Sequence, residues 1–367
     1  MDDQHPTVPT WTPAAPPEAR RRRLGPGLAA AAMAAVLLFG GVGLFAARQL
    51  SATGAGAASP EAAATGLLAA LDRKDLDRAA QYLDDEEGLL VATYRDRVVA
   101  ALAGRLTGAT GGSLDELDLT ARDVRFRRVA GSGGPDVAVV ELAAGTVGGR
   151  APDGAKLELP AEELNRRLAK ETKGAVTAVR VVTVRAGDRW RVSLLATAAE
   201  HARAAARGGQ PDWNRLGAAD QAAPGAASPE AAVRDLATAV EADADAAVGR
   251  LAPDERQVLA AYRQSVPAGS MGQLGDPGRL GLSVQGLTTR TERVADGVAK
   301  VHLTGGTVRP RPGSGGQAHR APLDLGRLGN RDVEPYLVAI QRDGTWYPSL
   351  VFTAADWMLT RTERERP

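Results

Sequence analysis

The residue types that usually carry catalysis or bind metals are scarce in this chain. It has no cysteine, which excludes disulfides, thiolate catalysis and cysteine-ligated metal sites. It has four histidines, none with a second histidine at ligand spacing: His5, His201, His302 and His319. No Gly-x-Ser-x-Gly elbow, dinucleotide fingerprint or phosphate loop occurs. We therefore expect no catalytic residue, no metal site and no cofactor, and we do not expect an enzyme.

Two polar features of the sequence are candidate sites, one for catalysis and one for calcium binding. In "VAKVHL", Lys300 and His302 alternate with apolar residues, so the strand period puts His302 beside a lysine on the wetter face of a strand. This pattern favours a solvated histidine over a catalytic base. The acidic run Asp84–Glu87 lacks the glycine and ligand spacing of a calcium loop, so we interpret it as a solvated helix end.

Four aromatic residues stand out because aromatics make up only 4% of the chain. They form two pairs at matching places in a repeated pattern: Tyr94 with Tyr262, and Trp190 with Trp346. Aromatic side chains line apolar ligand pockets, but they also fill cores. Core packing is the favoured interpretation here. A ligand pocket is the alternative.

The elements that carry these residues occur twice. "SPEAA" begins at Ser59 and again at Ser228, and each copy is followed by a helix-like run. Three further blocks then recur in the same order: "TYRDRV" and "AYRQSV", "VAVVELAAGTV" and "VAKVHLTGGTV", and "GDRWRVSLLATAAE" and "DGTWYPSLVFTAAD". The chain therefore contains one domain duplicated.

Each copy begins with helices and ends with strands. Ser59 and Ser228 are predicted N-caps, each followed by a proline at the first helical position. The last strands form a predicted hairpin, with its turn at 187–188 in the first copy and 343–344 in the second. Helices followed by an antiparallel sheet indicate an α+β fold.

An uncharged stretch of residues precedes the repeats, at 24–47. As a helix it would be about 36 Å long, enough to cross a bilayer. Arg20, Arg21, Arg22 and Arg23 come directly before it, which predicts a cytoplasmic N-terminus and an extracytoplasmic remainder. A cleaved signal peptide is the alternative, but the apolar run is longer than usual for one.

The small-residue first helix and the tryptophan-bearing terminal strand resemble the nuclear transport factor 2-like superfamily. The resemblance covers roughly 59–200 and 228–357. It implies cone-shaped α+β domains, with helices packed into the curved sheet, of the kind found on single-pass anchors in actinobacterial envelope proteins. Enzymes of that superfamily use a carboxylate or histidine inside the cone, so a hydrolase or isomerase stays a minor hypothesis.

The predicted organisation follows the chain in this order: a disordered cytoplasmic tail (1–23), a transmembrane helix (24–47), a tether (48–58), the first domain (59–207), a flexible linker (208–227) and the second domain (228–367). We expect few contacts across the linker and independent folding of the domains. The net charge of +1 gives no reason to expect a nucleic-acid partner. The expected function is binding or scaffolding in the cell envelope, with an unidentified protein partner. The alternative is a carrier or sensor that holds a small apolar molecule in one cone.

Overall fold

The computed structural model describes residues 56–107, 119–150, 156–216, 225–265, 282–310, 323–325 and 334–364. The predicted tail, the predicted membrane helix and the four arginines before it lie outside these residues, as do His5 and His319. Within the described ranges, no helix has the length and apolar character needed to cross a bilayer.

Each copy contributes helices followed by strands and a closing helix. The first repeat contains α2 (Pro60–Asp72), α3 (Leu76–Ala80), α4 (Asp85–Thr107), β1 (Thr120–Gly133), β2 (Val137–Arg150), β3 (Lys156–Pro160), α6 (Ala161–Glu171), β4 (Arg180–Ala186), β5 (Arg189–Ser193) and α7 (Leu194–Ala205). A short 3-10 helix, η2 (Trp213–Arg215), follows it. The second repeat contains α8 (Pro229–Ala242), α9 (Ala244–Val248), α10 (Pro253–Tyr262), β6 (Leu282–Ala295), β7 (Val298–Pro310), β8 (Leu323–Asp324), β9 (Tyr336–Arg342), β10 (Thr345–Ser349) and α12 (Leu350–Arg364).

Two antiparallel sheets result, with the same strand order. The first is β1-β2-β4-β5 with β3 beside β2, and the second is β6-β7-β9-β10 with β8 beside β7. This mixed α+β fold fits the sequence repeat. The hairpins turn at the predicted residues, and Asp343 and Gly344 both have the positive φ of a type I′ turn. Pro348 does not disturb its strand, because β10 is an edge strand that pairs with β9 along its whole length.

The predicted N-caps are present. The Ser59 hydroxyl accepts a hydrogen bond from the Ala62 N–H at 3.1 Å, and Ser228 accepts one from Ala231 at 3.2 Å. Proline occupies the first helical position in both helices. The repeated "SPEAA" is therefore a helix start.

A second repeated signal is a glycine that bends each long hairpin. Gly145 in β2 and Gly306 in β7 have φ values of 101° and 125°, which side-chain-bearing residues rarely adopt. Both lie opposite register shifts in the neighbouring strand. A Cβ on Gly145 would come within 2.6 Å of the Val124 Cα, so glycine is required where the strands bend.

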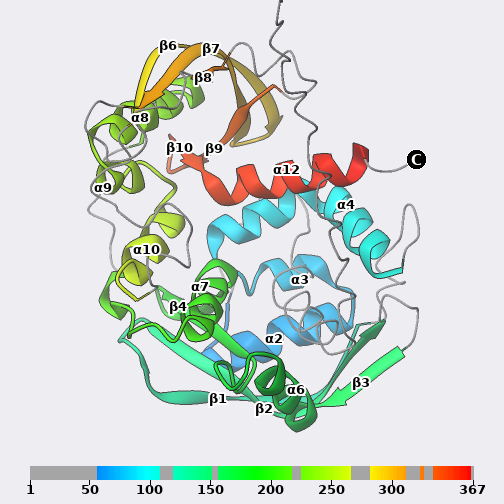
Figure 1. Ribbon diagram of the computed structural model, residues 1–367. Coiled ribbons are helices and arrows are strands. Elements are labelled where there is room, and N and C mark those ends of the chain that lie inside the picture. Colours follow the sequence, from blue (N-terminus) through cyan, green and yellow to red (C-terminus); the bar gives the residue numbers. More distant parts are fainter. Residues whose placement is uncertain are drawn as a thin grey trace, which may run out of the picture.

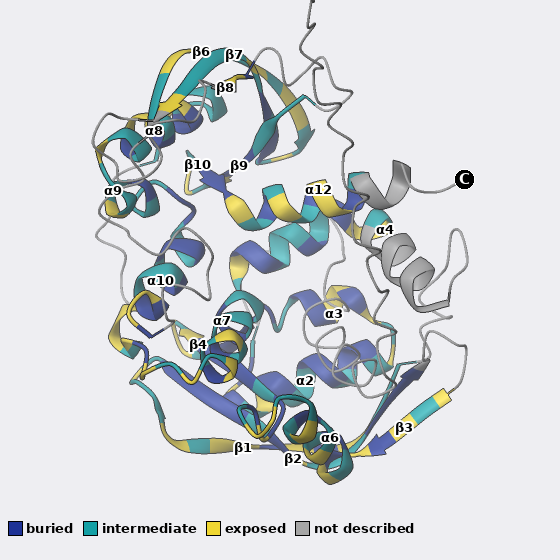
Figure 2. Cartoon of the chain, in the orientation of Figure 1, coloured by how far each residue is buried: buried dark blue, intermediate teal, exposed yellow. Residues whose placement is uncertain are grey.

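The middle of the first sheet is buried on both faces, whereas the outer strands β1 and β3 carry exposed residues (Figure 2). On one face, α2, α3 and α6 pack on alternate residues such as Ala138 and Val140. On the other face, Val137 and Val139 contact α7 and α10. All four of these strand residues have no exposed surface. The sheet therefore has no wet face at this point.

Two helices cover the second face of each sheet: the closing helix of the same repeat (α7 or α12) and, beside it, a helix of the other repeat (α10 or α4). Tyr94, on α4 of the first repeat, packs with Val298, Val338 and Ile340 of the second sheet. Tyr262, on α10 of the second repeat, packs in the cluster formed by Val137, Val139, Val182 and Val184 of the first sheet. Figure 1 shows the sheets at opposite ends of the molecule, with α4, α7, α10 and α12 between them.

This exchange corrects the expectation of few contacts between the copies. The first part of the predicted linker is also packed: Leu216 is buried, and the Trp213 ring meets the Tyr262 ring edge to face at 5.9 Å. The end of the predicted tether belongs to the fold as well. Ala57 exchanges two backbone hydrogen bonds with Trp190, and Ala226 does the same with Trp346.

A candidate functional site between the repeats

The N-terminal turns of α4 and α10 meet where the two repeats join. The Glu86 N–H donates to Asp254 Oδ2 at 3.2 Å, and the Asp254 N–H donates to Glu86 Oε1 at 3.1 Å. Each acidic side chain thus caps the helix of the opposite repeat. We call the region formed by Asp84–Glu87, Asp254, Glu255 and the groups they contact the junction.

The next residue on each helix binds the closing helix of its own repeat. Glu87 accepts hydrogen bonds from the Leu194 and Leu195 N–H groups at the start of α7, both at 2.7 Å. Glu255 accepts equivalent bonds from Leu350 and Val351 at the start of α12, at 2.8 and 3.0 Å. Each glutamate also accepts a hydrogen bond from the serine that caps that helix, Ser193 or Ser349. These carboxylates therefore hold the helix N-termini.

Each of the two sheets contributes one arginine to the junction. Arg191 on β5 and Arg342 on β9 both bind the Asp85 carboxylate. The Arg191 side chain is only 7% exposed, although it alternates with the buried Trp190 and Val192 along β5 and therefore lies on the opposite face of the strand. The interpretation of Asp84–Glu87 as a solvated helix end is wrong for Glu86 and Glu87, which are buried, whereas the Asp85 side chain is 45% exposed.

Burial raises the pKa of the carboxyl groups in the junction. It raises the pKa of Glu87 and of Glu255 to about 7, although the hydrogen bonds from the helix N-termini act in the opposite direction. Burial likewise raises the pKa of Glu86, and the neighbouring Asp254 and Glu255 charges add to the rise. Burial also raises the pKa of Asp254.

A small cavity lies inside the junction. Its walls are Glu86, Glu87, Ser193, Leu195, Asp254, Glu255, Val351 and Phe352, and about 10 Å³ is open to the centre of a water molecule. That is room for about one water. Glu86 lines this cavity, and its Oε2 is buried and has no hydrogen-bonding partner among the described residues. Within the same residues, no group of histidine, aspartate and glutamate side chains is arranged to hold a metal ion.

A second buried acid lies on the closing helix of each repeat. Asp356 on α12 accepts hydrogen bonds from Arg97 at 2.6 Å and Tyr336 at 2.5 Å, and lies 2.8 Å from Lys300 Nζ. Burial alone would raise the pKa of Asp356, but these three donors outweigh it and hold the pKa below its usual value. Its counterpart, Glu200 on α7, binds the guanidinium group of Arg203 at 2.6 and 2.7 Å. Groups held this way stabilise the fold and are poorly suited to proton transfer.

His302 differs from the expectation of a solvated position. His302 is 8% exposed, with Nε2 3.0 Å from Glu292 and Nδ1 2.9 Å from Glu334. The prediction failed because α12 and α4 cover this face of the sheet, so the lysine and histidine that mark it are paired and buried. His201 lies on α7 with Nε2 2.9 Å from the Arg180 carbonyl, and burial lowers its pKa.

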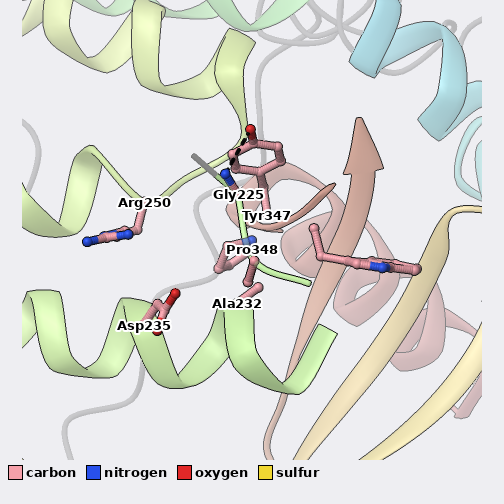
Figure 3. A pocket seen from close by; sticks show the side chains of 8 residues that line it. Gly225, Ala232, Asp235, Arg250, Tyr347 and Pro348 are labelled. Carbon is pink, nitrogen blue, oxygen red and sulfur yellow. Dashed lines mark hydrogen bonds between the residues drawn. The ribbon is translucent and has the colours of Figure 1, made fainter. Parts of the chain in front are cut away.

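The structure places three of the four repeated aromatics in cores. Tyr94 and Tyr262 are 1% and 2% exposed in the exchanged-helix clusters, and Trp190 is 9% exposed in the core under α2. Burial raises the pKa of both tyrosines. Trp346 is half-buried and lines a second small pocket at the start of the second repeat (Figure 3). There the Tyr347 hydroxyl accepts a hydrogen bond from the Gly225 N–H at 3.1 Å, and the space again holds about one water.

Sequence reasoning missed the junction glutamates, although a signal was present. Glu87 and Glu255 each precede the aligned tyrosine by seven residues. The Ser-Leu pairs they bind, which begin at Ser193 and Ser349, also align. Read together, these two repeated features would have paired each acid with the N-terminus of a closing helix.

The fold and the junction define a duplicated α+β protein whose repeats exchange helices across a buried acidic contact. No protein-family model and no curated protein matches the chain. A solved structure described as an Ntf2 like protein involved in plasmid conjugation is 9% identical, and the alignment covers 68% of this chain and 84% of that one. Its TM-score is 0.16, too low to carry an argument about fold or function.

Proposed function

We propose that this chain is a membrane-anchored binding or scaffolding protein of the cell envelope, without enzymatic activity. In this proposal the uncharged stretch 24–47 anchors the chain, and two nuclear transport factor 2-like repeats lie outside the cytoplasm. The partner is an envelope protein that binds the paired repeats as one surface.

The observation that carries the proposal is the exchange of α4 and α10. Two domains on a flexible linker would move independently, whereas two domains that complete each other's cores keep a fixed relation. A fixed relation is useful for presenting a composite binding surface. The buried acids support this view, because Glu87, Glu255 and Asp356 are all engaged in holding helices.

The carrier hypothesis receives less support. In the first repeat, the space under α2 contains leucine and alanine side chains from three helices, together with Trp190 and Phe126. These side chains pack where an apolar ligand would have to lie. A carrier would need that packing to open.

Two measurements on the full chain test the proposal. Reporter fusions after residue 55 should be active for an exported reporter and inactive for a cytoplasmic one. Activity of the cytoplasmic reporter would rule out the envelope location. Mass spectrometry of an organic extract of the purified protein should find no stoichiometric small molecule after correction for bulk lipid. One molecule per chain, retained by wild type and lost on Trp190→Ala, would favour the carrier instead.

A further inference from the structure

The junction holds more negative than positive charge. Six carboxyl groups meet three guanidinium groups: Asp84, Asp85, Glu86, Glu87, Asp254 and Glu255 against Arg191, Arg342 and Arg256. Arg191 and Arg342 both bind Asp85. Arg256 is directed toward the carbonyls of Gly249 and Leu251 and lies 5.9 Å from the Tyr347 ring. The buried part of this negative charge, on Glu86, Glu87 and Glu255, must be neutralised by protons, by hydrogen bonds or by a cation.

The hydrogen bonds indicate which group holds a proton. Glu87 and Glu255 each receive two N–H donors and a serine hydroxyl at a helix N-terminus, an arrangement that suits an ionised carboxylate. Glu86 lines the water-sized cavity and receives one N–H on Oε1, while its Oε2 is buried and has no partner in the described part of the chain. An ionised oxygen in that position would be costly.

We propose that the Glu86 carboxyl is protonated in the closed junction, and that its deprotonation as pH rises loosens the contact between the two repeats. A protonated Glu86 can donate from Oε2 to a water in the cavity while Oε1 still accepts from Asp254. A metal ion is the less favoured neutralising group, because the described acids have no arrangement that could hold one.

The direction of the pH effect follows from the raised pKa values. Burial raises the pKa of Glu86 above that of the unfolded chain, so the folded protein binds this proton more tightly. The stabilisation is present at mildly acidic pH and is lost as pH rises through the folded value. The pKa of about 7 for Glu87 and Glu255 acts in the same direction.

The chain has no cysteine of its own, so spin labels attach only to introduced cysteines and the distance between the two repeats can be measured. Spin labels on Asp188→Cys, whose side chain is 92% exposed in the β4–β5 turn, and on Gln285→Cys, an exposed residue of β6, report the separation of the repeats in the full chain. We expect one narrow distance distribution at about pH 5.5 and a broader, longer one at about pH 8.5.

Glu86→Gln, which is neutral at every pH, should broaden clearly less than wild type at about pH 8.5, and the remaining change is the part that Glu87 and Glu255 contribute. Glu162→Gln removes a carboxylate that is 88% exposed on α6, and should respond to pH as wild type does. A wild-type distribution that does not change with pH, or a Glu86→Gln protein that broadens as much as wild type, would overturn the proposal. Restoration of the narrow distribution at about pH 8.5 by millimolar calcium would overturn the assignment to a proton.

A second measurement needs no variant and covers the case in which Glu86→Gln does not fold. The infrared band of a protonated carboxyl should be present in wild-type protein at about pH 6, and should disappear over the same pH range as the distance change. Absence of that band, or its loss at a different pH, would contradict the proposal.

Discussion

At the scale of single residues, Trp190 shows how packing decides between the two interpretations of an aromatic. Its side chain is 9% exposed in the core that α2 covers, and its backbone pairs with Ala57. Trp346 occupies the equivalent place in the second repeat but is half-buried beside a small pocket. The first repeat therefore depends more on its tryptophan than the second does.

Trp190→Ala should lower the free energy of unfolding by about 3–5 kcal/mol, because it removes a large buried ring and leaves a cavity. Trp346→Ala is the matched control and should cost clearly less. Urea unfolding followed by circular dichroism measures both changes. A Trp190→Ala protein with a wild-type midpoint would contradict the packing account and favour an open pocket.

The sequence could predict which residues are large and apolar, and one of them, Trp190, is 9% exposed in a core. It could not predict the burial of Arg191, Glu86 and His302. A charged residue is expected on a wet face, and nothing in its own strand or helix says that another element covers that face. The cover comes from elements distant in the sequence: α12 and α4 over the face that carries His302, and the start of α10 against Glu86.

At the scale of elements, the N-caps, the hairpin turns and the alternation of strands were all predictable, because each depends on neighbouring residues. The position of α4 was not. Its tyrosine predicts a helix with a buried face, but hydrophobic period alone does not say which sheet that face will meet. In this chain it meets the sheet of the other repeat.

Tyr94→Ala should therefore loosen the second repeat more than the first. Loss of this ring removes contacts with Val298, Val338 and Phe352. We expect amide hydrogen exchange in β7 and β9 to become more than about tenfold faster, with a smaller change in β2 and β4.

Tyr262→Ala is the mirror control, because its ring packs on β2 and β4 of the first repeat. It should reverse the pattern, with faster exchange in the first sheet. If each tyrosine variant instead loosened the sheet of its own repeat, the exchange of helices would be wrong.

At the scale of the whole molecule, the repeat in the sequence predicted two sheets of the same construction, and the strand orders agree. The repeat in the sequence did not imply that the two copies fold independently. The repeated blocks describe what each copy contains, whereas independence depends on which copy completes each core. The Tyr94 and Tyr262 clusters each combine residues from both repeats.

Fragments 56–207 and 222–367 should accordingly be unstable alone and should assemble when mixed. In isolation, the first fragment lacks α10 over Val137 and Val139, and the second lacks α4 over Val298 and Ile340. Each would expose a strip of valine-rich sheet, together with a junction carboxylate that has lost its partner. Circular dichroism should show weak, broad melting for each fragment and a cooperative transition for the equimolar mixture, and size-exclusion chromatography should show a one-to-one complex. Cooperative melting of either fragment as a monomer would mean that the exchanged helix is dispensable. The two repeats would then be separate domains in contact, and Glu86 would not be expected to couple them.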